Sequence, residues 1–107
     1  MEEVINKPLK IEIDNYSGPL EVLLDLAKTQ KVDLANISIT QLADQFINFM
    51  NKAKELNLDL ASEYLLMATW LTYLKSKLLL PETDEEEFKA LEVAERLKIQ
   101  LKKLELI

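Results

Sequence analysis

The side chains of this chain that could perform acid–base or nucleophilic chemistry are carboxylates, lysines and a few hydroxyls, because it has no His and no Cys. Without them there is no imidazole base, catalytic thiol, zinc finger or ordinary transition-metal site, and a single Gly excludes a glycine-rich phosphate loop. The densest carboxylates, Glu85, Glu86 and Glu87, lie at an expected helix start, where no buried acid is predicted. Ser62 and Ser76 have no base to activate them. We therefore predict no enzyme, catalytic residue, cofactor, metal site or small-molecule ligand.

The net charge of the chain bears on which kinds of partner it can bind. The chain of 107 residues carries 13 Lys+Arg against 19 Asp+Glu, a formal net charge of −6. Acids surround its few clustered lysines (Lys52, Lys54, Lys75 and Lys77), which argues against direct nucleic-acid binding. No run of apolar residues is long enough for a membrane span. We expect a cytoplasmic protein with a binding or structural role.

The sequence predicts that the binding surfaces are presented by a small all-α bundle of three to four helices with a short N-terminal extended strand or arm. Residues 9–14 alternate apolar and polar, which predicts a strand that packs on the helices or pairs with another chain. Gly18 as N-cap and Pro19 at the first helical position predict a helix that ends near residues 29–31. Ser38 and Gln41 form a capping box for a second helix that ends near residues 54–57. Its apolar stripe is Ile39, Leu42, Ala43, Phe46, Met50 and Ala53.

A third helix is predicted between Asp59 as N-cap and Pro81 as stop signal, and it is apolar on nearly every side. One seam at heptad-like spacing contains Leu60, Tyr64, Met67, Leu71, Leu74 and Leu78. A second seam, rotated from the first, contains Leu66, Trp70, Tyr73, Lys77 and Leu80. A helix of this kind must be buried nearly all round. Either it is the central core helix, further covered by the fourth helix, or one seam is left for a partner's coiled coil; periodicity alone does not say which seam faces out.

The last part of the chain begins with an acidic hinge at residues 82–87, in which Thr83 and Glu86 form a second capping box. A fourth helix is predicted over residues 88–107. Its expected stripe is Phe88, Leu91, Ala94, Leu97, Leu101 and Leu104. The chain stops without a C-cap, as a cut through a longer polypeptide would.

Four blocks of residues, in order, resemble a known family. Residues 16–24, Tyr-Ser-Gly-Pro-Leu-Glu-Val-Leu-Leu, are similar to the aromatic-x-Gly-Pro-Leu-acid-x-Leu-Leu opening of segregation and condensation protein A (ScpA), the bacterial kleisin family, and residues 32–39 resemble its turn into the second helix. Residues 58–68 and the Lys-Ser-Lys-Leu-Leu-Leu-Pro run at 75–81 resemble the start and close of its third helix. Thr69, Thr72 and Lys77 depart mildly from the pattern.

The resemblance implies a division of the chain and a set of partners. Residues 1–81 would be the N-terminal kleisin domain, and residues from 88 onward the start of the middle region that binds a dimer of the accessory protein ScpB. The family bridges the ATPase heads of a structural-maintenance-of-chromosomes (SMC) dimer, with the third helix docked on the coiled-coil neck beside one head. The expected protein is then a nucleoid-associated adaptor for chromosome segregation and condensation.

The two arguments together predict the contact residues. For the SMC neck these are Leu66, Met67, Trp70, Tyr73, Leu74, Lys77 and Leu80; for ScpB they are Phe88, Leu91, Leu97 and Leu101. The alternative is a structural homodimer that buries the extra apolar surface between two copies, in one version by swapping the fourth helix.

Overall fold

The computed structural model describes residues 17–106, which form four α-helices and one short 3-10 helix with no strand in that range. In chain order they are α2 (Pro19–Lys28), η1 (Leu34–Asn36), α3 (Ile39–Glu55), α4 (Ser62–Leu79) and α5 (Asp84–Glu105). The predicted all-α fold is confirmed. The strand predicted at residues 9–14 lies outside the described residues.

The starts of α2 and α3 follow the local signals in the sequence. Gly18 is the N-cap of α2 and Pro19 its first residue. At the start of α3, the Ser38 hydroxyl accepts a hydrogen bond from the Gln41 backbone N–H at 3.1 Å. The Ser38 N–H donates to the side chain of Gln30 at 2.8 Å, so the second bond of the cap comes from the preceding loop. This cap therefore fastens the loop as well as the helix.

A small amide network holds α2 against α3. The Gln45 amide donates to the Thr29 hydroxyl at 2.7 Å and to the Leu26 carbonyl at 3.2 Å. The Gln30 amide in turn donates to the Gln45 carbonyl oxygen at 3.1 Å. The Leu26 carbonyl also accepts from the Thr29 N–H at 3.0 Å, so the Gln45 amide adds a contact from α3 to the last turn of α2.

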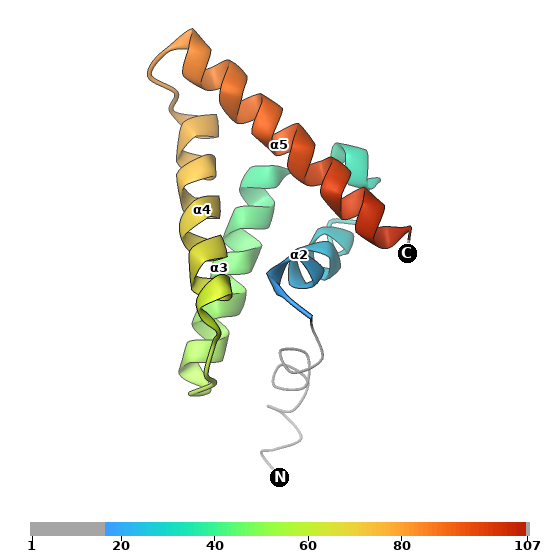
Figure 1. The fold of residues 1–107 in the computed structure, drawn as a ribbon, viewed down its shortest axis with the longest axis vertical. Coiled ribbons are helices and arrows are strands. Elements are labelled where there is room, and N and C mark those ends of the chain that lie inside the picture. The colour runs from blue at the N-terminus through green and yellow to red at the C-terminus, as the bar shows by residue number, and fades with distance from the viewer. Residues whose placement is uncertain (1–16, 107) are drawn as a thin grey trace.

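Helix α4 lies beside α3 and begins later than the sequence suggests (Figure 1). Its N-cap is Ala61, which has no side-chain acceptor, so the prediction of Asp59 as N-cap is wrong. Leu60 is partly buried against the core, which keeps the chain extended until the helix starts. The helix ends at Leu79, two residues before Pro81, as the stop signal predicts.

Helix α5 begins at Asp84, which corrects the expected boundary at Phe88. The Thr83 hydroxyl accepts from the Glu86 N–H at 3.0 Å, and Glu86 accepts from the Glu82 N–H at 2.9 Å. Acidic residues are favourable in a first helical turn, so the acids predicted as a hinge form part of the helix. The connection shrinks to residues 80–83, and α5 runs back from the end of α4 across α2 (Figure 1).

One core joins all these elements. Its fully buried large side chains are Val22, Leu23, Leu42, Phe46, Leu71, Leu97 and Leu101. Every residue of the predicted α3 stripe is buried, and Phe49, which the stripe omitted, packs with its ring centroid 6.2 Å from that of Phe46. No polar or charged residue among residues 17–106 is buried. Because α5 supplies Leu97 and Leu101, it belongs to the same folded unit as α2, α3 and α4.

Candidate docking surface on α4

Helix α4 presents one of its two apolar seams to the core. Tyr64, Leu71 and Leu74 are buried, and Met67 and Leu78 pack partly buried against them. The core therefore takes the first of the two seams seen in the sequence. Burial raises the pKa of the Tyr64 hydroxyl above its ordinary value, with smaller contributions from the charges of Glu63 and Glu21.

The second seam lies open. Its side chains keep 69% of their surface exposed at Leu66, 39% at Trp70, 63% at Tyr73 and 79% at Leu80. Scattered exposed apolar side chains are ordinary, but a contiguous row along one helix marks an interaction surface. Trp and Tyr are suited to such a surface because they bury a large area with few rotatable bonds. We call this row, with Lys77, the outer seam.

Two threonine hydroxyls beside the outer seam are already hydrogen-bonded within α4. The Thr69 hydroxyl donates to the Leu65 carbonyl at 3.0 Å, and the Thr72 hydroxyl donates to the Ala68 carbonyl at 2.8 Å. An unpaired donor is the usual penalty for burying a hydroxyl, and covering these two would not incur it. These two hydroxyls can therefore lose their water at low cost, whereas the Tyr73 hydroxyl and the Trp70 N–H would need partners on the docked helix.

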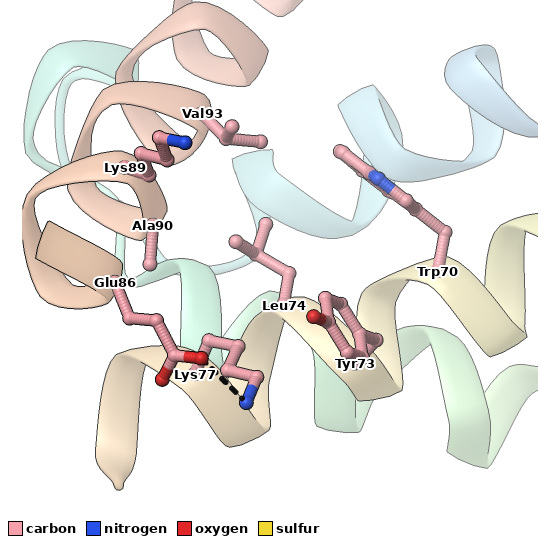
Figure 2. Close-up of a pocket in the computed structure, with 8 residues that line it drawn as sticks. All are labelled: Trp70, Tyr73, Leu74, Lys77, Glu86, Lys89, Ala90 and Val93. Carbon is pink, nitrogen blue, oxygen red and sulfur yellow. Dashed lines mark hydrogen bonds and ion pairs between the residues drawn. The ribbon is translucent and has the colours of Figure 1, made fainter. Parts of the chain in front are cut away.

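An ion pair joins the C-terminal part of the outer seam to α5. Lys77 Nζ lies 3.3 Å from the Glu86 carboxylate and 5.5 Å from the centre of the Tyr73 ring (Figure 2). The hydrogen bond to Glu86 raises the pKa of Lys77. The pKa of Glu86 is lowered, first by the Glu82 N–H and then by Lys77. The single cation of the seam therefore has a partner within the fold.

Between α4 and α5 the chain leaves a cleft of about 220 Å³. It is lined by Trp70, Tyr73, Leu74, Lys77, Glu86, Lys89, Ala90 and Val93. Figure 2 shows Trp70, Leu74 and Val93 around an open space between the two helices, with the Lys77–Glu86 pair at one end. The cleft continues the outer seam sideways onto α5.

The residues predicted for the neck contact occupy different positions on α4. Leu66, Trp70, Tyr73 and Lys77 share the outer seam on α4, and Leu80 follows as the C-cap just past the end of the helix. Met67 lies toward the core, and Leu74 is buried except where it lines the cleft.

The predicted ScpB set, in contrast, is divided by the fold. Phe88 and Leu91 are exposed, whereas Leu97 and Leu101 are buried in the core. Nine residues separate Phe88 from Leu97, about two and a half turns, so these side chains project from opposite sides of α5. A single stripe through all of them is therefore wrong; the buried face of α5 consists of Ala90, Ala94, Leu97 and Leu101.

Sequence reasoning missed the α5 wall of the cleft. Its members, Glu86, Lys89, Ala90 and Val93, follow the spacing i, i+3, i+4, i+7, which places them on one face. That spacing was present in the sequence, but a charged pair and two small apolar residues do not form a conspicuous apolar stripe.

Other kinds of site find little support in residues 17–106. No group of three or more Asp or Glu in this range is arranged to hold a metal ion, and none of its helices has the length and hydropathy to cross a membrane. Lys75 pairs with Asp44 on α3, and Lys77 pairs with Glu86. Two of the four clustered lysines are thus engaged with carboxylates.

These features define a small all-helical domain with an unpartnered apolar helix face. The family model for segregation and condensation protein ScpA matches residues 26–103. The chain is 44% identical over 79 residues to segregation and condensation protein A of Clostridium acetobutylicum, covering 74% of this chain and 32% of that protein. It is 43% identical over 82 residues to that of Mycoplasma mobile, covering 75% and 33%. The chain belongs to the ScpA family, and it spans about a third of the length of these relatives.

Proposed function

We propose that this domain is a non-enzymatic adaptor that docks the outer seam of α4 on the coiled-coil neck of an SMC ATPase. In this role it helps to bridge an SMC dimer for chromosome segregation and condensation, in the cytoplasm and on the nucleoid. The relatives' names, segregation and condensation protein A, support the process. The exposed row Leu66, Trp70, Tyr73 and Leu80 is the observation that carries the mode of docking.

A coiled coil suits this surface for geometric reasons. The outer seam advances by alternating steps of four and three residues, the repeat by which helices pack side by side with knobs in holes. Helix α4 has 18 residues, so it is about 27 Å long and offers five turns to a partner. A partner helix that lies along α4 would bury the row of side chains that the fold leaves exposed to solvent.

The outer face of α5 is a separate proposed contact, with a dimer of ScpB. Phe88 and Leu91 are exposed there, and Leu106 continues the same side of the helix. Leu97 and Leu101 would support this face from within rather than touch the partner.

The test of neck docking is co-purification of this chain with an SMC head-plus-neck fragment. Leu66→Asp and Tyr73→Asp place a charge in the outer seam and should abolish capture, while helical circular dichroism remains that of the parent chain. Val32→Asp is the matched control, because Val32 is half exposed on another part of the fold. Normal capture of both seam variants would show that the surface is assigned wrongly.

Self-association is the competing function, since two copies could bury their outer seams against each other. Helix α5 already packs on its own chain through Leu97 and Leu101, which removes the need for a swapped α5. Sedimentation of the isolated chain separates the two functions. A monomer at high concentration favours the adaptor, whereas a dimer broken by Tyr73→Asp favours self-association.

A further inference from the structure

We propose that α5 forms part of the docking site, and that one bulky apolar side chain of the partner helix enters the cleft between α4 and α5. The inference rests on the proposed function that α4 docks on a coiled coil. It goes further because it assigns the receiving position, the kind of side chain received, and a role to α5 residues.

The lining of the cleft has the geometry of a knob site. In coiled coils a knob enters a hole made by four residues of the facing helix at i, i+3, i+4 and i+7. On α4 the lining residues are Trp70, Tyr73, Leu74 and Lys77, and on α5 they are Glu86, Lys89, Ala90 and Val93. Both sets have this spacing. Two four-residue holes thus open into one cleft, as at the junction where a third helix packs against a helix pair.

The size of the cleft fits such a knob. Its volume is about 220 Å³. An apolar cavity of roughly 150 Å³ is enough to bind benzene. A Leu, Met or Phe side chain from a neighbouring helix is therefore within its capacity. The small side chain of Ala90 on the α5 wall leaves this room, because a larger residue there would project toward Leu74 (Figure 2).

The charges around the cleft favour an apolar guest over a charged one. Lys77 and Glu86 neutralise each other at one end, and Lys89 Nζ, at the solvent-exposed edge of the lining, lies 3.9 Å from the Glu85 carboxylate. Leu74, Ala90 and Val93 offer no polar group to a guest. A charged side chain placed in the middle of the cleft, against these three residues, would lose its water without gaining a partner there.

The Lys77–Glu86 pair also has a mechanical consequence. It joins the last turns of α4 to the first turn of α5, next to the connection at residues 80–83. It thereby helps to hold the two walls at the separation that leaves the cleft open. We assign the pair a positioning role.

The test compares two Val→Phe substitutions, one in the cleft and one at Val32 on another part of the fold, with affinity for an SMC head-plus-neck fragment measured by fluorescence anisotropy. Val93→Phe fills the cleft and should weaken binding by about tenfold or more, the equivalent of excluding one buried apolar side chain. Val32→Phe, at a half-exposed position outside the cleft, should bind as the parent does. Equal binding by these two variants overturns the inference.

A third variant separates this inference from the proposed function. Leu66→Asp alters the outer seam outside the cleft. If it abolishes binding while Val93→Phe does not, neck docking stands and the role of the cleft is wrong. If Leu66→Asp binds normally, the proposed function itself fails.

Cross-linking provides a second test that does not depend on whether the Val93→Phe variant folds. The chain has no cysteine, so Val93→Cys and Leu91→Cys each introduce a unique thiol. With single cysteines placed in turn along the partner's neck helix, Val93→Cys should form a disulfide with one of them and Leu91→Cys with none. A scan in which Val93→Cys stays unlinked, or in which both positions link equally, overturns the inference.

Discussion

The opposite environments of two leucines on α4 make a quantitative prediction. Leu71 is fully buried, whereas Leu66 keeps 69% of its surface exposed. Leu71→Ala should lower the free energy of unfolding by about 3–5 kcal/mol, because it removes buried methyl groups and leaves a cavity. Leu66→Ala should change it by no more than about 0.5 kcal/mol.

Binding should show the reverse order. Full burial of a Leu side chain contributes about 1.5–3 kcal/mol. The exposed fraction of Leu66 could therefore contribute roughly 1–2 kcal/mol on docking, so Leu66→Ala should weaken neck binding about 5- to 30-fold. Folded Leu71→Ala should bind close to normally, because Leu71 lies on the opposite seam.

Thermal unfolding followed by circular dichroism, together with anisotropy titration at a temperature where both variants are folded, measures both quantities. For a domain of this size about 1 kcal/mol corresponds to a shift of 4–8 °C in Tm. Leu71→Ala should thus lose roughly 10 °C or more, and Leu66→Ala no more than about 4 °C. Equal losses of stability would falsify the division of α4 into an inner and an outer seam, and unchanged affinity in Leu66→Ala would refute the docking surface.

Three further predictions concern the parts that hold this surface in place. Ser38→Ala removes the acceptor for the Gln41 N–H and should cost about 1 kcal/mol in urea unfolding, with Ser38→Thr as a milder control. Lys31 has a φ of 59° in the left-handed region, so Lys31→Gly should stabilise the chain by up to about 1 kcal/mol; a loss of stability would contradict this. The pKa of Glu86 is lowered in the fold, so its ionised form stabilises the fold at pH values above the ordinary pKa of a carboxyl group. This stabilisation is lost as the pH falls through the lowered pKa of the folded state. The stability difference between the parent and Glu86→Gln should therefore shrink on acidification, and a difference that is constant from pH 7 to pH 3 would count against the pair.

The sequence predicts the helices well because their ends depend on local chemistry. Gly18 with Pro19, the Ser38 cap, the stop before Pro81 and the Thr83 cap each act over about one turn, and each is found where expected. Asp59 shows the limit of this reasoning. An acceptable capping residue is not used when tertiary packing of its neighbour Leu60 holds the chain extended.

The assignment of helix faces could not be completed from sequence, because it depends on which neighbour is present. Both seams of α4 are rich in large apolar residues, so their composition does not decide which one the core takes. On α5 the large side chain of Phe88 suggested a buried stripe, yet Ala90 and Ala94 form the buried side together with Leu97. Small residues let α5 approach the bundle closely, and a pattern search that weights large apolar residues overlooks them.

The exposed face of α4 is consistent with a surface that is covered only part of the time. A helix that is apolar on all sides would normally be a core helix, but α4 keeps Leu66 and Tyr73 in water. The hydroxyls of Thr69 and Thr72, which bond to the helix's own carbonyls, give this face polarity without requiring an external acceptor. The domain can therefore stay folded with the seam exposed, and a docked helix can cover these two hydroxyls without leaving them unpaired, which are two conditions that a surface must meet to bind and release a coiled coil.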